Sequence, residues 1–123
     1  MLIEDLLREK RRALHFSLID PDRQPPETAG RLARQCRDAG TDAILVGGSG
    51  RFPASLLDRT VRAVKGEVDL PAILFPGSAR SVTAAADGIL FMSLLNANDP
   101  RYFIREQMRA APWIERIEPT QPG

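Results

Sequence analysis

Apolar stretches alternate with polar or glycine-rich loops along this chain, and four of the stretches have the composition of buried β-strands. Each is rich in branched apolar residues, three of the four contain a phenylalanine, and each then runs into a turn-forming sequence. With their loops they read HFSLIDPD, AILVGGSG, AILFPGS and GILFMSLLN, which predicts strands at about residues 13–19, 43–46, 72–75 and 88–92. Polar loops after buried strands are typical of a parallel α/β sheet, whose ligand sites form where the strands end.

Helical periodicity fills most of the intervals, with prolines and glycines at the ends of the predicted helices. Helices are predicted over residues 2–10, from Pro25 and Pro26 to Gly40, from near Pro53 onward, and from Pro100 to Pro112. The residues expected to face inward are Leu2, Leu6 and Leu7, then Ala29, Leu32, Ala33 and Cys36, then Leu57, Val61 and Val64, and finally Phe103, Ile104, Met108 and Ala111.

Two segments lack room or pattern for a regular element. Residues 76–87 separate the last two predicted strands and are too few for a full crossover helix, so an irregular or single-turn connection is predicted. The tail at 113–123 is rich in proline, shows no strand pattern and is expected to fray. Residues 1–123 otherwise read as one domain, because a chain of 123 residues that is 43% hydrophobic can bury one modest core.

Charge and composition argue against several classes of protein. The 17 Lys and Arg residues balance 16 Asp and Glu residues, so no strongly basic surface favours nucleic acid. The longest apolar stretch, residues 88–95, is far shorter than the ~20 residues of a membrane helix, and no signal peptide is recognised. We therefore expect a cytoplasmic protein. Cys36 is the only cysteine, which excludes an internal disulfide and a multi-thiolate metal site.

The loops after the first two predicted strands carry residues suited to binding a cation and an anion. Asp20 and Asp22 flank a proline, and a strand-end carboxylate can hold Mg²⁺, although Asp-Pro-Asp is also ordinary turn chemistry. Gly47 and Gly48 can bring backbone N–H groups close to an anion, and the Ser49 hydroxyl can complete a metal or phosphate contact. Glycine-rich turns also occur without a ligand. Because consecutive parallel strands are usually neighbours, Asp20 and Ser49 are predicted to point at one cation.

The later loops offer further polar groups. Gly77 lies in a sharp turn after the third predicted strand, and Ser93 and Asn96 follow the fourth at the rim of the sheet. Each also has an ordinary turn or helix-cap explanation. His15, the only histidine, is predicted to be structural, with a role as general base as the minority alternative.

The motifs LIDPD, GTDAILVGGS, LPAILFPGS and ADGILFMSLLN together resemble the successive strand-end motifs of the geranylgeranylglyceryl phosphate synthase family, which includes bacterial heptaprenylglyceryl phosphate synthases. The resemblance covers roughly residues 13–98, and four motifs in order are far more specific than any one of them. It implies the N-terminal half of a modified TIM barrel, in which a non-helical stretch replaces the third helix. The short connection at 76–87 agrees with this expectation.

The resemblance also implies a function. Members of the family transfer a prenyl group from a polyprenyl diphosphate to the free hydroxyl of sn-glycerol 1-phosphate, which forms the ether bond of archaeal-type lipids. By resemblance, Asp20 and Ser49 match the Mg²⁺-binding positions, with Gly47 and Gly48 beside the diphosphate. The candidates for the substrate pocket are Phe75, Gly77, Ser93 and Asn96.

The chain departs from the family in length. A TIM barrel typically has eight strands in about 250 residues, whereas four strands are predicted in these 123 residues. The family's later motifs, which hold glycerol phosphate, have no counterpart in this sequence. A truncated prenyltransferase and a catalytically silent half-barrel, which binds phosphate or metal or serves as an oligomerisation module, are therefore both open. Open strand edges and an apolar inner face favour a homo-oligomer.

Overall fold

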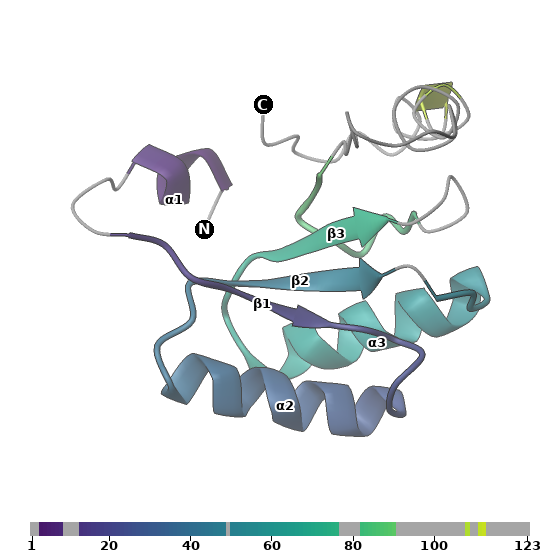
Figure 1. Cartoon of the computed structure of the whole chain (residues 1–123), viewed down its shortest axis with the longest axis horizontal. Coiled ribbons are helices and arrows are strands. Elements are labelled where there is room, and N and C mark those ends of the chain that lie inside the picture. The colour runs from purple at the N-terminus through teal and green to yellow at the C-terminus, as the bar shows by residue number, and fades with distance from the viewer. Residues whose placement is uncertain are drawn as a thin grey trace.

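Four parallel strands form the sheet at the centre of the computed structural model (Figure 1), which describes residues 3–8, 13–48, 50–76, 82–90, 108 and 111–112. The strands lie in chain order, β1-β2-β3-β4, so that every crossover joins neighbouring strands. Their bounds are β1 Phe16–Ile19, β2 Ala43–Gly48, β3 Ala72–Pro76 and β4 Gly88–Ile89. The α/β fold class predicted from the spacing of the apolar stretches is confirmed.

Two long helices cover one face of the sheet, and a short helix lies on the other side (Figure 1). The long helices are α2, Pro26–Asp38, and α3, Ala54–Glu67, and the short one is α1, Ile3–Arg8. Each long helix follows a proline in an extended conformation, which suits the residue before a first helical turn. Because α2 follows β1 and α3 follows β2, both begin at the carboxyl edge, the edge of the sheet where its parallel strands end.

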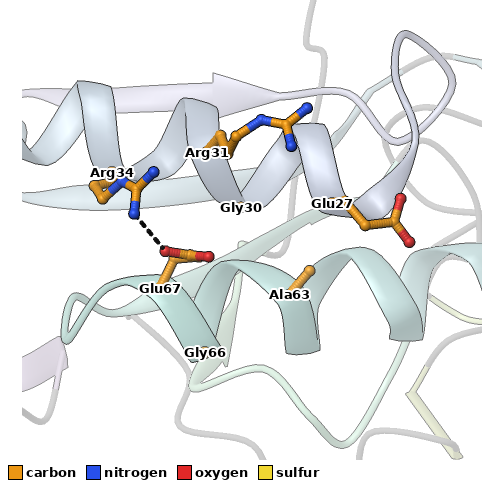
Figure 2. A pocket seen from close by; sticks show the side chains of 7 residues that line it. All are labelled: Glu27, Gly30, Arg31, Arg34, Ala63, Gly66 and Glu67. Atoms are coloured by element: carbon orange, nitrogen blue, oxygen red, sulfur yellow. Dashed lines mark hydrogen bonds and ion pairs between the residues drawn. The ribbon is translucent and has the colours of Figure 1, made fainter.

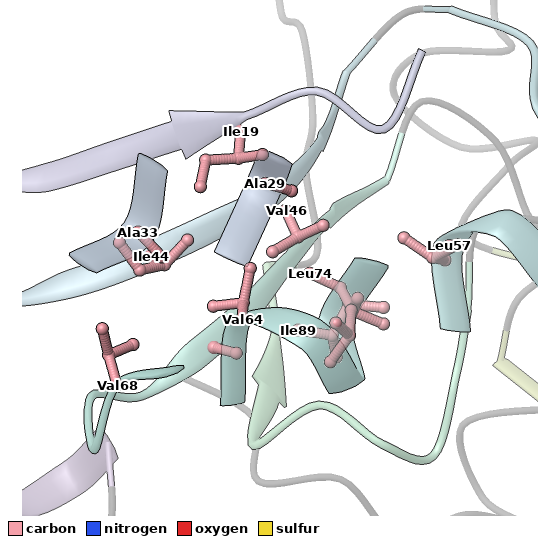
Figure 3. Close-up of a cluster of buried hydrophobic side chains, with 12 residues drawn as sticks. Ile19, Ala29, Ala33, Ile44, Val46, Leu57, Val64, Val68, Leu74 and Ile89 are labelled. Carbon is pink, nitrogen blue, oxygen red and sulfur yellow. The ribbon is translucent and has the colours of Figure 1, made fainter. Parts of the chain in front are cut away.

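The main hydrophobic core lies between the sheet and the two long helices (Figure 3). Successive strand side chains face opposite sides, and those of Ile44, Val46 and Leu74 point into this core with at most 1% of their surface exposed. The helices contribute Ala29 and Ala33 from α2 and Leu57, Val61 and Val64 from α3. These five helical residues are among those predicted to face inward. Burial of each large side chain stabilises the fold by roughly 1.5–3 kcal/mol.

The opposite face of the sheet carries a smaller core beneath α1. Ile3 and Leu6 of α1 pack against Ala43 and Ile73, at the beginnings of β2 and β3. Leu18 lies near the end of β1 on this same face by strand alternation, and it is 53% exposed. Leu18 pairs in register with Leu45, which pairs in turn with the buried Ile73, so this apolar face is buried at β3 and exposed at the edge strand β1.

The connection between β3 and β4 contains no helix in its described part, residues 82–87. Side chains of α3 hold it instead. The Thr83 hydroxyl donates to Asp58 Oδ1 (2.6 Å), and Lys65 Nζ donates to Asp87 (2.7 Å). Asp87 also accepts the backbone N–H of Ala72 at the start of β3 (2.8 Å). These hydrogen bonds attach the segment to the helical layer and to the sheet, as the packing of a crossover helix does elsewhere.

The structure changes the predicted bounds of several strands. β1 begins at Phe16, not near residue 13, because the N–H of His15 bonds to the side chain of Asp42 instead of to a neighbouring strand. β2 continues through Gly47 and Gly48, which pair with the end of β3. β4 ends at Ile89, one residue before Leu90, whose N–H still bonds to the carbonyl oxygen of Leu74 (2.9 Å); residues 91–92 of the predicted strand lie outside the described residues.

Two side chains expected to face inward are exposed. Leu7 is 37% exposed because it stands one residue from the buried Leu6, which is about 100° around the helix. Met108, in the last predicted helix, is 68% exposed. The tail at 113–123 lies outside the described residues. Within the described part of the chain, no helix is both long and apolar enough to span a membrane.

Candidate functional site at the carboxyl edge

Asp20 follows β1 directly, and hydrogen bonds within its own loop hold it in place. Its Oδ1 accepts the backbone N–H of Asp22 (2.9 Å). Its carbonyl oxygen accepts the N–H of Arg23 (3.1 Å) and the Nε2–H of Gln24 (2.7 Å). An aspartate that binds the backbone two residues ahead forms a common turn, which supports the turn interpretation of this loop. The same turn orients the carboxylate, and among the described residues Oδ2 accepts no hydrogen bond.

The carboxylate of Asp20 lies against Gly48, the last residue of β2. A Cβ on Gly48 would stand 2.7 Å from Asp20 Oδ2, closer than real side chains approach, and the φ of Gly48 is +149°. The second carboxylate of the loop contacts the next loop in a similar way, since a Cβ on Gly50 would stand 3.1 Å from Asp22 Oδ2. The loop after β1 therefore contacts the end of β2 through Asp20 and the loop after β2 through Asp22.

Gly47 has a different reason to be glycine. A Cβ on Gly47 would stand 2.0 Å from the carbonyl oxygen of Phe75, and its φ is +147°. The residue is paired with Phe75 in the β2–β3 ladder. The prediction that Gly47 and Gly48 belong to a loop is therefore wrong, because glycine tolerates the positive φ that lets the ladder continue to the end of β2. Close approach of two strand backbones explains Gly47 without a ligand.

The two long helices begin near this site and lack side-chain caps. Neither Pro25, before α2, nor Pro53, before α3, makes a side-chain hydrogen bond to the first turn. The first N–H groups of a helix have no partner within the helix, and its N-terminus carries a partial positive charge. The carboxyl edge thus combines the carboxylates of Asp20 and Asp22 with two helix ends that favour a bound anion.

The donor set fits a hard cation held jointly by protein and substrate. In the described part of the chain, no group of three or more His, Cys, Asp or Glu side chains could hold a metal ion. Mg²⁺ usually takes one or two carboxylates and fills its other positions with water and phosphate oxygens. Asp20 offers one carboxylate of this kind directly after β1. A cation bound here would therefore depend on ligands that a phosphate-bearing substrate supplies.

A groove of about 390 Å³ lies elsewhere, between α2 and α3 (Figure 2). Its residues are Glu27, Gly30, Arg31, Arg34, Ala63, Gly66 and Glu67. Small residues line its floor, and the ion pair between Arg34 and Glu67 (3.3 Å) crosses it in the close-up. Both residues of this pair are exposed on the helical layer. We interpret the groove as a consequence of close helix packing and not as part of the carboxyl-edge site.

Comparison with known proteins places this geometry in a family. The model of the PcrB family matches residues 4–121. The chain belongs to the PcrB family. It is 52% identical over 104 residues to the geranylgeranylglyceryl phosphate synthase of Methanothrix thermoacetophila, covering 85% of this chain and 41% of the relative. It is 46% identical over 121 residues to the synthase of Pyrococcus horikoshii, covering 95% and 48%. The family resemblance recognised in the four motifs is confirmed.

Solved structures show the same relationship. The synthase of Thermoplasma volcanium matches with a TM-score of 0.91 and 36% identity over 98% of this chain and 49% of its own. The synthase of Thermoplasma acidophilum, solved in complex with its substrate sn-glycerol 1-phosphate, matches with a TM-score of 0.92 and 37% identity over 98% and 50%. The chain thus spans about half the length of these relatives, and its fold is half of a modified TIM barrel.

The structure of this PcrB-family chain describes some of the predicted site residues and not others. Asp20 lies at the carboxyl edge as expected, and Gly48 contacts it. Phe75 is half-buried in β3 beside Gly47. The other predicted site residues lie outside the described residues: Ser49, Gly77, Ser93 and Asn96. The shared cation contact of Asp20 and Ser49 accordingly stays a prediction.

His15 lies at the opposite edge of the sheet, before β1. Its Nδ1 is 3.0 Å from the Thr41 hydroxyl, and its backbone N–H donates to Asp42 Oδ2 (2.8 Å). The hydroxyl of Ser17 also donates to that of Thr41 (2.9 Å). These contacts confirm the structural interpretation of His15, since they join β1 to the segment before β2 away from the site.

Sequence reasoning missed the residues that anchor the connection before β4. Thr83 is 8% exposed and donates to Asp58, which also accepts from Arg62 Nε (2.8 Å). The hydrogen bond from Thr83, followed by the hydrogen bond from Arg62, lowers the pKa of Asp58, although desolvation by burial opposes the shift. Asp58 and Arg62 are spaced as a helical i,i+4 pair, which the sequence could have shown; Thr83 gave no such signal.

Proposed function

We propose that this chain carries the donor side of a Mg²⁺-dependent prenyl transfer site, where a prenyl group passes from a polyprenyl diphosphate to the free hydroxyl of sn-glycerol 1-phosphate. Two findings support the proposal: membership of the PcrB family, and relatives named geranylgeranylglyceryl phosphate synthase. The single structural observation that carries it is the contact of the Asp20 carboxylate with Gly48 at the carboxyl edge.

Asp20 would hold the cation through Oδ2, while the turn formed by its Oδ1 keeps the carboxylate in position. Ser49 is proposed as the second protein ligand. Mg²⁺ bound there would neutralise the charge that grows on the diphosphate oxygens. The N-termini of α2 and α3 favour the same negative charge.

The proposed transfer breaks one bond and forms another. The bond between the allylic carbon and the diphosphate oxygen breaks, and its electron pair leaves with the diphosphate. The hydroxyl oxygen of sn-glycerol 1-phosphate would form the new ether bond to that carbon, and its proton would pass to water. Phe75 is proposed to line the prenyl pocket, because it is half-buried next to Gly47 near the end of the sheet.

Binding of Mg²⁺ and diphosphate without turnover is a second candidate function for these 123 residues. The observation that favours it is that the chain spans 41% and 48% of the first two relatives. The substrate complex known for a structural neighbour belongs to a chain about twice as long. The proposed transfer then requires a further segment to hold the acceptor.

Asp20→Asn tests the proposed site, with Asp22→Asn as the matched control in the same loop. Loss of the Asp20 charge should weaken binding of inorganic pyrophosphate in the presence of Mg²⁺ by about tenfold or more, because a charged contact contributes about 1.5–3 kcal/mol. Asp22→Asn should weaken it less. Isothermal titration calorimetry with pyrophosphate, with and without Mg²⁺, measures both effects. Equal losses in the two variants would show that Asp20 is the wrong carboxylate.

A further inference from the structure

Arg51 is a cation at the carboxyl edge that the proposed mechanism has not used. It is exposed, and among the described residues its guanidinium makes no hydrogen bond or ion pair. Several cations on the long helices are paired, as Arg34 is with Glu67, Arg62 with Asp58 and Lys65 with Asp87. An exposed arginine without a described partner is available to a ligand.

The backbone places Arg51 next to the proposed cation position. Gly50, its neighbour in the chain, contacts Asp22 Oδ2, and Gly48, three residues earlier, contacts Asp20 Oδ2. Pro53, two residues later, precedes the first turn of α3. Arg51 therefore lies between the two loop contacts and the uncapped start of α3, and consecutive Cα atoms are only about 3.8 Å apart. The side chain of Arg51 therefore starts from the loop that joins the Asp20 contact to α3.

A second cation at this position would help to balance the negative charge of a bound diphosphate. A diphosphate carries more negative charge than one Mg²⁺ neutralises, and Asp20 and Asp22 add two carboxylates to the same region. An arginine guanidinium matches phosphate oxygens with two parallel hydrogen bonds. The phosphate farther from the prenyl group has oxygens beyond those needed for the cation. Arg51 can bind these remaining phosphate oxygens, and among the described residues its guanidinium makes no contact that the fold would lose.

We propose that Arg51 binds the terminal phosphate of the prenyl diphosphate and so selects diphosphate over monophosphate. This inference rests on the proposed function, because it assigns a residue to the diphosphate of that same site. It assigns Arg51 a binding role that Asp20 cannot fill, since a carboxylate repels phosphate unless a cation lies between them. The site would then hold the two phosphates in distinct ways, one through the cation and one through the guanidinium.

The test compares Arg51→Gln with Arg59→Gln, another exposed arginine without a described partner, which lies on α3 away from the loops. Calorimetric titration of the 123-residue chain uses inorganic pyrophosphate and, separately, orthophosphate, both with Mg²⁺. Arg51→Gln should bind pyrophosphate about tenfold more weakly, with a much smaller change for orthophosphate. Arg51→Lys should recover part of the loss, because lysine restores the charge without the paired geometry. Arg59→Gln should bind both ions as the parent chain does.

Two outcomes separate this inference from the proposed function. If the parent chain binds Mg²⁺-pyrophosphate in an Asp20-dependent manner but Arg51→Gln binds it as tightly as Arg59→Gln, the role of Arg51 is overturned and the proposed function stands. If the parent chain fails to bind Mg²⁺-pyrophosphate at all, both are overturned. Circular dichroism and urea unfolding of each variant show whether folding is intact, and because Arg51 and Arg59 are exposed, neither change should shift the urea midpoint of unfolding measurably.

Discussion

Gly47 and Gly48 are adjacent glycines with the same backbone conformation and different neighbours. Both have φ near +150°, at +147° and +149°. The space beside Gly47 is filled by the backbone of Phe75, whereas the space beside Gly48 is filled by the carboxylate of Asp20. A side chain at Gly47 would collide with a strand that cannot move away, and one at Gly48 would collide with a functional group that can. Gly47 therefore allows two strands to approach closely, and Gly48 leaves room for the carboxylate of Asp20.

Gly48→Ala should displace the Asp20 carboxylate, and Gly40→Ala is the matched control. Gly40 also has a positive φ, of +105°, but a Cβ there would meet no atom within 4 Å. Both variants should lose about 1–3 kcal/mol of unfolding free energy from backbone strain. Only Gly48→Ala should also weaken Mg²⁺-dependent pyrophosphate binding. Urea unfolding and calorimetry measure the two effects, and intact binding by Gly48→Ala would contradict the placement of the site.

Thr83→Val should make the protein less stable, and the loss should depend on pH. The Thr83 hydrogen bond lowers the folded-state pKa of Asp58, so its contribution is present above the unfolded pKa of about 3.9 and fades as pH falls through the folded value. We expect a loss of about 1 kcal/mol near pH 7 that shrinks below about pH 4. Urea unfolding across this range measures the loss, and Asp58→Asn should abolish its pH dependence. A loss that stays constant with pH would contradict the proposed linkage.

The long helices pack closely because α2 presents a glycine to α3. A Cβ on Gly30 would stand 3.0 Å from the carbonyl oxygen of Ala63 and 3.0 Å from Cγ of Glu67. Gly66, in α3 itself, has no atom within 4 Å of the corresponding position. One helical glycine therefore lies at a tight packing contact, and the other does not. The groove in Figure 2 lies over this contact.

Gly30→Ala and Gly66→Ala should have opposite effects on stability. Alanine favours the helix by up to about 1 kcal/mol over glycine, and Gly66→Ala should gain part of that amount. Gly30→Ala must push α2 away from a backbone carbonyl, which typically costs about 1–3 kcal/mol and outweighs the gain. Thermal or urea unfolding of the two variants decides the question. A Gly30→Ala variant as stable as Gly66→Ala would show that the helices can separate at little cost.

At the scale of the whole molecule, the chain spans about half the length of its relatives. The open part of the inner face around Leu18 lies on the edge strand β1, where no strand of the described residues pairs on the other side. Exposed edges and apolar faces promote association. The homo-oligomer predicted from the sequence stays a prediction, and light scattering of the purified chain would test it.

The purified 123-residue chain should bind Mg²⁺-pyrophosphate yet form no prenylglyceryl phosphate at a measurable rate. Transfer requires the acceptor hydroxyl within near-attack distance of the allylic carbon, and the family motifs that hold its phosphate have no counterpart in this sequence. A second copy of the chain would bring the same residues again and would not supply the missing motifs. The assay uses labelled sn-glycerol 1-phosphate, Mg²⁺ and several prenyl diphosphates. Robust product formation would contradict the prediction and require an acceptor site within these residues.

The amino-acid sequence determined the fold class, the order of the strands and the position of Asp20 at a strand end. These features follow from local patterns, because hydrophobic periodicity and turn residues act over a few neighbouring positions. The helix faces of α2 and α3 were predictable for the same reason, as the burial of Ala29, Val61 and Val64 shows. Parallel strands then bring their polar loops to one edge, so the candidate site could be located before the side chains were placed.

Only the tertiary structure decided which atoms meet at that edge. The contact of Asp20 with Gly48, the separate role of Gly47, and the bonds of Asp58 to Thr83 and Lys65 to Asp87 join residues far apart in the chain. The latter two span 25 and 22 positions. Such contacts depend on how whole elements pack, which positions the side chains only after the helices and the sheet have buried their apolar faces.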